Sequence, residues 1–119
     1  MKILFCDQNK HVRQFIRREL ESDGYEVITA GKSSEILEII KSNEPPHILV
    51  VDPDVFLFEN KDILSEIKNH APKIRIIIYT LLADLLSNPI LRDAKAFVEK
   101  AGDPEMLKQT IKDVLENQS

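Results

Sequence analysis

Five short apolar runs along the chain alternate with segments in which apolar residues recur at helical spacing. Such runs, rich in β-branched residues, are typical of strands that are buried on both faces, as in a parallel sheet. The runs lie at residues 2–6, 25–29, 48–51, 74–79 and 96–98. Five strands alternating with five amphipathic helices predict a doubly wound α/β fold, with one five-stranded parallel sheet and right-handed crossovers.

Cap and turn residues predict where the helices begin and end. Gly24 falls where the first helix would end, since glycine readily takes the positive φ found there. We expect side-chain caps from Ser33 or Ser34 for the second helix, Asn60 for the third and Asp103 for the last. Between residues 81 and 94, leucines favour a helix and Ser-Asn-Pro opposes one, so we expect a short or irregular fourth helix.

The third apolar run ends abruptly in the acidic stretch Asp52-Pro53-Asp54. In open α/β sheets, ligands bind beyond the carboxyl ends of the strands, so Asp52 is the first candidate for chemistry. The polar residues that follow or end strands, and so meet at one edge of the sheet, are Asp7, Gln8, Asp52, Asp54, Thr80 and Lys100. Carboxylates that hold a hard cation, a hydroxyl that donates to an anion and an ammonium that neutralises it together describe a phosphoryl-handling site.

The composition indicates one ordinary globular domain. With 119 residues, 43% of them hydrophobic and 30% charged, the chain is long enough for one core but not for two. We therefore expect a single domain over residues 1–119, without an effector domain. No apolar run is long enough to span a membrane and the amino terminus lacks a signal-peptide pattern, so we expect a cytoplasmic protein with no membrane partner.

The charged and imidazole side chains give no sign of a nucleic-acid partner or a histidine metal site. The formal net charge of −4 argues against direct nucleic-acid binding, which needs a basic face. Arg13, Arg17 and Arg18 cluster on a predicted helix that also carries acidic residues, which favours a solvated face over a binding patch. The histidines fall away from the strand ends and are not expected to be metal ligands: His11, His47 and His70.

Four segments of the sequence together resemble one family. Positions 3–30, ILFCDQNKHVRQFIRRELESDGYEVITA, run without a gap along the family's usual opening, which places Asp7 and Gln8 on its acidic pair. The other three segments look like its phosphoacceptor, hydroxyl and lysine strands: PHILVVD at 46–52, IIIYT at 76–80 and AFVEK at 96–100. From Lys2 to about Leu115, the chain resembles the receiver domain of two-component response regulators, which is CheY-like and has a flavodoxin-like fold. The resemblance implies the strand order 2-1-3-4-5.

The resemblance also implies a mechanism for phosphorelay signalling. Asp52 would accept a phosphoryl group from a phosphohistidine on a sensor histidine kinase or a phosphotransfer protein. Mg²⁺ would be the cofactor, held by Asp7, by Asp52 and by the backbone carbonyl of Asp54. Lys100 would pair with the phosphoryl group. Apart from self-phosphorylation and dephosphorylation at Asp52, no enzymatic activity is implied.

A switch and an output surface follow from the same resemblance. Thr80 would move to hydrogen-bond the phosphoryl group, and Phe97 would turn inward as the aromatic partner of the switch. The last two strands and helices would then bind a downstream protein or an effector domain, through a population shift between two states. Homodimerisation through the last helices is a further expectation from the family.

Three positions depart from the family pattern near this site. Gln8 replaces the second acid of the pair, so one anionic ligand becomes a neutral amide and we expect the affinity for Mg²⁺ to fall. Ala101 replaces the proline that usually follows Lys100, and we expect a trans peptide there because a cis bond without proline costs about 2.5–4 kcal/mol. Leu81 replaces a small residue after the fourth strand and is expected to narrow access to the phosphoacceptor.

Two other functions stay open on the sequence. A degenerate receiver would act as a phosphorylation-independent protein-interaction module, which the departures from the family pattern favour. VDPDV at 51–55 also looks like the nucleophile motif of haloacid-dehalogenase-type phosphatases, although in those enzymes the motif usually ends the first strand. Taken alone, Lys100 and Asp52 are also consistent with a structural ion pair.

Overall fold

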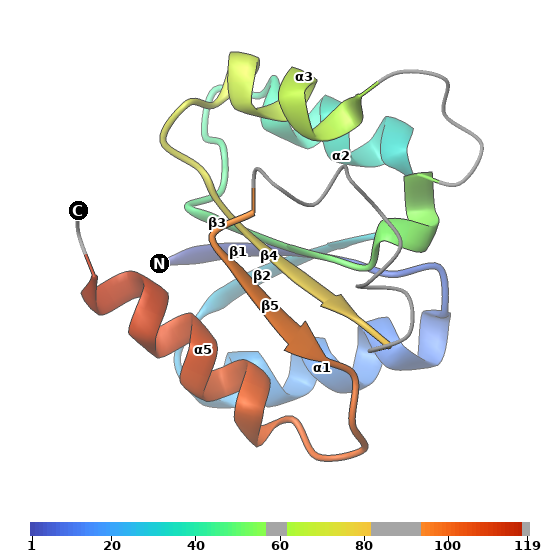
Figure 1. The fold of residues 1–119 in the computed structure, drawn as a ribbon, viewed down its shortest axis with the longest axis vertical. Coiled ribbons are helices and arrows are strands. Elements are labelled where there is room, and N and C mark those ends of the chain that lie inside the picture. The colour runs from blue at the N-terminus through green and yellow to red at the C-terminus, as the bar shows by residue number, and fades with distance from the viewer. Residues whose placement is uncertain (57–61, 82–93, 118–119) are drawn as a thin grey trace.

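The computed structural model describes residues 1–56, 62–81 and 94–117, which form one parallel sheet with helices on both faces (Figure 1). The elements in chain order are β1 (Lys2–Cys6), α1 (Lys10–Ser22), β2 (Glu26–Ala30), α2 (Ser33–Ile40), β3 (Ile48–Val51), the 3₁₀-helix η1 (Pro53–Phe56), α3 (Ile63–His70), β4 (Arg75–Thr80), β5 (Ala96–Glu99) and α5 (Glu105–Glu116). The irregular helix expected between residues 81 and 94 falls largely on residues 82–93, outside the described residues.

The sheet has the strand order β2-β1-β3-β4-β5, and every pair of neighbouring strands is parallel. Both the doubly wound α/β class and the order 2-1-3-4-5 are therefore confirmed. The chain first builds outward from β1 to β2 and then returns to place β3 on the other side of β1. Ligands of such sheets bind at the point where the winding reverses, and this point lies between the carboxyl ends of β1 and β3.

Helices cover both faces of the sheet and so bury its strands (Figure 1). One apolar core includes residues of α2 and α3, and the other includes residues of α1 and α5. Along β3, Leu49 and Val51 belong to the first core, whereas Ile48 and Val50 belong to the second. All four side chains are fully buried. The unbroken apolar run in the sequence is explained by this arrangement, because successive strand residues point to opposite faces and both faces are covered.

Two helix caps differ from the sequence expectation. Neither Ser33 nor Ser34 caps α2, because both already lie inside the helix; Lys32 occupies the cap position and makes no side-chain cap hydrogen bond. The N-cap of α3 is Asp62, whose side chain accepts a backbone hydrogen bond from the first turn. The expected cap, Asn60, lies outside the described residues. Asn and Asp are equally good caps, so the residue types did not separate the two positions.

Of two other helix ends, the end of α1 agrees with the sequence, whereas the start of α5 differs from the expected Asp103 cap by one residue. Gly24 follows α1 with a φ of 94°, a conformation that favours glycine. At the start of α5, the Asp103 Oδ1 atom accepts a hydrogen bond of 2.9 Å from the backbone N–H of Glu105, and Pro104 stands at the cap position between them. Among the helices of the described residues, none is both long enough and apolar enough to cross a lipid bilayer.

Truncation of a β3 side chain tests how much the two-sided burial of the sheet contributes to stability. Leu49→Ala is expected to lower the free energy of unfolding by about 2–5 kcal/mol, because it leaves a cavity in a fully buried strand. Met106→Ala removes a side chain that is 64% exposed and, as the control, should change this free energy by less than about 0.5 kcal/mol. Urea unfolding measures both, and equal losses would contradict the assignment of β3 to the core.

Candidate functional site

Four polar side chains stand at or just beyond the carboxyl ends of neighbouring strands. Asp7 follows β1, Asp52 follows β3, Thr80 ends β4 and Lys100 follows β5. The described residues include only four buried polar or charged side chains, and Asp7, Asp52 and Thr80 are three of them, with exposures of 3%, 5% and 1%. The polar groups that the fold removes from water are thus concentrated at one edge of the sheet.

The strand register places these residues next to one another. Because Cys6 lies opposite Val51, the acids that follow β1 and β3 leave the sheet side by side. The backbone N–H of Asp52 still donates to the Cys6 carbonyl at 3.0 Å, so the pairing continues to the first acid itself. On the other side, the backbone N–H of Lys100 donates to the Thr80 carbonyl at 2.7 Å, which fixes where the lysine side chain begins.

The Lys100 ammonium joins the two acids. Its Nζ atom lies 2.5 Å from Asp7 Oδ2 and donates a hydrogen bond to Asp52 Oδ2. Partial burial by itself lowers the pKa of Lys100, whereas the hydrogen bonds and negative charges of Asp52 and Asp7 raise it, and the raising effects prevail. A protonated lysine therefore bridges two buried carboxylates that come from different strands.

The remaining oxygen of each carboxylate is fixed by the turn that follows it. Asp7 Oδ1 accepts from the backbone N–H of Asn9 at 2.8 Å, and Asp52 Oδ1 accepts from that of Asp54 at 2.9 Å. Asp7 Oδ2 is buried and accepts no hydrogen bond of acceptable geometry in the described residues, although it faces the Lys100 ammonium. Both carboxylates are thus held in place by backbone donors and turn one oxygen toward the centre of the site.

The Gln8 side chain links the loop that follows β1 to the segment that follows β3. Its side-chain Nε2 donates a hydrogen bond of 3.0 Å to the backbone carbonyl of Asp54. The sequence predicted this carbonyl as a metal ligand and Gln8 as a weakened one, but it did not predict that the two groups would bond to each other.

Arg13 hydrogen-bonds to the backbone of the loop that follows β1, a role that the sequence did not predict. Its Nη1 donates to the backbone carbonyls of Asp7 and Gln8, at 2.7 and 3.1 Å. The guanidinium also lies against Gly31, where a Cβ atom would stand only 2.8 Å from Nη1. The interpretation of Arg13 as part of a solvated face is therefore wrong. The sequence signal available for this contact was Gly31, a glycine directly after β2. Arg17, which is half exposed and pairs with Glu21, does fit that interpretation.

The expected switch residues differ in exposure. The Thr80 side chain is buried at the site, whereas Phe97 on β5 is 49% exposed. Leu81, which was expected to narrow access to the phosphoacceptor, directly follows β4 and is 58% exposed. The peptide that joins Lys100 to Ala101 is trans, as expected, since the described residues contain no cis peptide bond.

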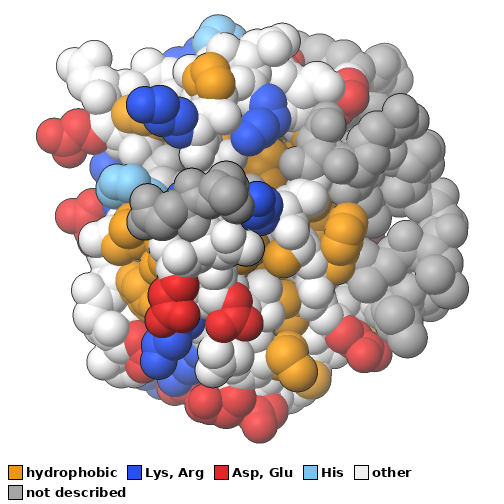
Figure 2. Space-filling model, turned by 60° about the vertical axis from the view of Figure 1, so that its left-hand side comes forward, with side chains coloured by type: hydrophobic (Ala, Val, Ile, Leu, Met, Phe, Trp, Pro, Cys, Tyr) orange, Lys and Arg blue, Asp and Glu red, His pale blue; other side chains and the backbone are white. Residues whose placement is uncertain are grey.

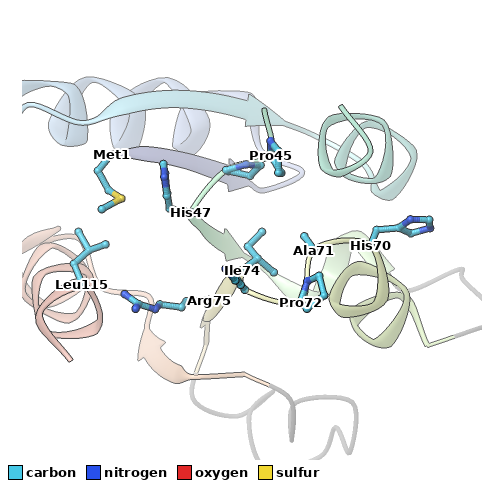
Figure 3. Close-up of a pocket in the computed structure, with 11 residues that line it drawn as sticks. Met1, Pro45, His47, His70, Ala71, Pro72, Ile74, Arg75 and Leu115 are labelled. Carbon is cyan, nitrogen blue, oxygen red and sulfur yellow. The ribbon is translucent and has the colours of Figure 1, made fainter. Parts of the chain in front are cut away.

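Two of the histidines lie at the opposite, amino-terminal edge of the sheet. His47 and His70 line a cavity of about 640 Å³ there, together with Met1, Ile74 and Leu115 among others (Figure 3). The Nδ1 atom of His47 accepts a hydrogen bond of 3.1 Å from the backbone N–H of Lys2, so this imidazole has a structural partner. Within the described residues, no group of three or more His, Cys, Asp or Glu side chains is arranged to hold a metal ion.

The surface seen in Figure 2 gives no support to a nucleic-acid site on that face. Its Lys and Arg side chains are interspersed with acidic and hydrophobic ones and do not form one extended basic patch.

The donor atoms at the carboxyl edge are chemically suited to Mg²⁺. Two carboxylates and one backbone carbonyl are hard oxygen ligands, and the buried Asp7 Oδ2 atom is paired with the Lys100 ammonium in this structure. A magnesium site commonly uses one or two carboxylates and completes its shell with water and phosphate oxygens. Asp7, Asp52 and the Asp54 carbonyl therefore fit the ion, with the reservation that Gln8 already bonds to that carbonyl.

A doubly wound sheet with two acids, a buried hydroxyl and a lysine at its carboxyl edge defines an α/β protein of the receiver type. The chain belongs to the response regulator receiver domain family, whose model matches residues 3–112. Receiver domains are signalling modules of two-component systems.

Individual relatives agree with this family. The probable transcriptional regulator ycf27 of Porphyridium aerugineum is 28% identical over 116 residues, which cover 96% of this chain and 48% of that protein. A receiver domain protein from Clostridium thermocellum is 30% identical, with a TM-score of 0.82 over 97% of this chain and 94% of that one. A CheY-like receiver domain protein from Methanospirillum hungatei is 27% identical, with a TM-score of 0.86 over 98% and 94%. The chain spans about half the length of the curated relatives it matches.

The pH dependence of stability tests the lysine bridge. Because the folded protein raises the pKa of Lys100 above its ordinary value of 10.5, the stabilisation is fully present below pH 10.5 and is lost as the pH rises through the folded value. Lys100→Met should therefore cost about 1.5–3 kcal/mol of unfolding free energy at pH 8, and this difference from wild type should shrink above pH 10.5.

Denaturant unfolding from pH 8 to pH 11.5 measures this difference. Titration of groups remote from Lys100 cancels in it, whereas that of Tyr79, whose pKa the Lys100 charge lowers, does not. The matched control is Lys112→Met, at an exposed position of α5, which should stay within about 0.5 kcal/mol of wild type at pH 8. A Lys100→Met difference that does not change across this pH range would show that the lysine contributes by packing and not by its charge.

Proposed function

We propose that this receiver domain accepts a phosphoryl group on Asp52 from a phosphohistidine of a sensor histidine kinase or phosphotransfer protein. The observation that carries the proposal is the Lys100 ammonium, which bridges Asp52 and Asp7 at a buried edge beside Thr80. A purely structural ion pair needs one carboxylate and no neighbouring hydroxyl. Two acids, a lysine and a hydroxyl from four different strand ends match the charge distribution of a phosphoryl group and its counterion.

In the proposed reaction, an Asp52 carboxylate oxygen attacks the phosphorus atom of the phosphohistidine. The P–N bond breaks, its electron pair stays on the imidazole nitrogen, and an acyl phosphate forms on Asp52. The backbone N–H of Asp54 orients the carboxylate through Oδ1, and the Lys100 ammonium offsets negative charge on the transferred group. Receiver domains generally bind Mg²⁺, and Asp7, Asp52 and the Asp54 carbonyl would hold it, where it neutralises phosphoryl oxygens.

The output would follow from a change at Thr80 and Phe97. In the present state Thr80 is buried at the site and Phe97 is half exposed on the neighbouring strand. A phosphoryl group on Asp52 adds acceptor oxygens that draw the Thr80 hydroxyl toward them, and the space it leaves admits the Phe97 ring. The surface of β4, β5 and α5 then changes its affinity for a downstream protein, for an effector domain or for a second copy of the chain.

We also propose that residues 1–119 act as one receiver domain in the cytoplasm, where sensor kinases present their phosphohistidine.

A second candidate function is that of a degenerate receiver, which binds partners without phosphorylation. It is favoured by the hydrogen bond from Gln8 to the Asp54 carbonyl, which satisfies that carbonyl without any metal. No observation favours the phosphatase alternative, because VDPDV at 51–55 follows the third strand and not the first.

Beryllofluoride mimics a phosphoryl group on a carboxylate and separates these candidates. With millimolar Mg²⁺, it is expected to shift the backbone amide resonances of Thr80 and Phe97, because both residues belong to the proposed switch. Asp52→Asn should abolish the shifts, whereas Glu38→Gln, which removes a carboxylate charge from an exposed position of α2, should preserve them. If wild type shows no shift under these conditions, the phosphoacceptor proposal fails and the degenerate receiver is favoured.

A further inference from the structure

The Gln8 side chain joins the loop that follows β1 to the loop that follows β3. It does so at the Asp54 carbonyl oxygen, which is one of the proposed ligands of the cation. Its Nε2 donates to the Asp54 carbonyl at 3.0 Å, although the two residues are 46 positions apart in sequence. An amide nitrogen has no lone pair available for a metal, and its hydrogens carry partial positive charge. The amide donor and a cation therefore compete for the same carbonyl oxygen.

The backbone of Gln8 is held more firmly than its side chain. Arg13 donates to the carbonyls of Asp7 and Gln8, and Asp7 Oδ1 accepts from the next backbone amide, that of Asn9. The guanidinium itself rests against Gly31. With the loop fixed at these points, rotation of the Gln8 side chain would break its hydrogen bond to the Asp54 carbonyl without moving the loop.

We propose that Gln8 is a latch: a positioning residue whose amide holds the Asp54 carbonyl and must release it before a divalent cation binds at Asp7 and Asp52. The inference rests on the proposed function, in which these groups hold Mg²⁺, and it adds the residue that controls access to them. While the latch is closed, the Lys100 ammonium offsets part of the negative charge of the two carboxylates and Gln8 donates to the carbonyl. The cation-free site is consequently stable in itself.

The proposal is testable because two possible roles of the Gln8 side chain predict opposite changes in Mg²⁺ affinity when that side chain is removed. If Gln8 is a latch, Gln8→Ala binds Mg²⁺ more tightly than wild type, because the hydrogen bond from Gln8 to the Asp54 carbonyl no longer has to be broken. One net hydrogen bond corresponds to about a 2- to 10-fold gain in affinity. If the Gln8 side-chain oxygen is instead a metal ligand, the same truncation weakens binding. Gln8→Glu cannot donate to the carbonyl and adds an anionic ligand, so it should bind most tightly of all.

The experiment is a titration of the whole chain with MgCl₂ alone, followed through the amide resonances of Asp52 and Asp54 and repeated with Mn²⁺ through paramagnetic broadening. The expected order of affinity is Gln8→Glu, then Gln8→Ala, then wild type. Gln14→Ala, at an exposed position of α1, is the matched control and should titrate like wild type. Before cation is added, Gln8→Ala should also shift the Asp54 and Val55 amides, because the Asp54 carbonyl loses the hydrogen bond from Gln8.

Weaker or unchanged Mg²⁺ binding by Gln8→Ala overturns the latch, as does an absence of cation binding by every variant. The titration contains no phosphoryl donor or analogue. If Asp52 does not accept a phosphoryl group, the order of cation affinities is unaffected, so failure of the proposed function and failure of the latch are distinguished.

Discussion

The interaction on which the site depends is the Lys100 ammonium shared between Asp7 and Asp52. Two carboxylates with exposures of 3% and 5% would repel each other strongly if no cation lay between them. The fold supplies that cation from β5, two strands away from β3, because parallel strands end at a common edge. The sheet order thereby determines the electrostatics of the site.

Backbone groups fix the rest of the site around this bridge. The turns after β1 and β3 each direct a backbone N–H at one carboxylate oxygen, and Arg13 holds the first of these turns by its carbonyls. Such fixed donors orient the acids without competing for the oxygens that face Lys100. In the proposed reaction, a carboxylate held in this way would need little reorganisation when a phosphoryl group arrives.

The sequence predicted the fold and the principal site residues because their signals are local. A strand buried on both faces gives an unbroken apolar run, and the first polar residue after it marks the sheet edge, which identified Asp7, Asp52 and Thr80. Lys100 lies one residue further on, after Glu99. The hydrogen bond between Gln8 and the Asp54 carbonyl and the contact of Arg13 with Gly31 were not predictable in this way. Both depend on side-chain directions across loops distant in sequence, and residue type alone does not distinguish Asp62 from Asn60 as the helix cap.

The central claim is that Asp52 is a phosphoryl acceptor, and covalent mapping tests it most directly. The chain is incubated with acetyl phosphate and Mg²⁺, the acyl phosphate is reduced with borohydride, and the modified peptide is identified by mass spectrometry. A single reduced position at Asp52 is the predicted result. Modification at another residue, or none after prolonged incubation, would contradict the assignment of Asp52 and leave the lysine bridge as a structural ion network.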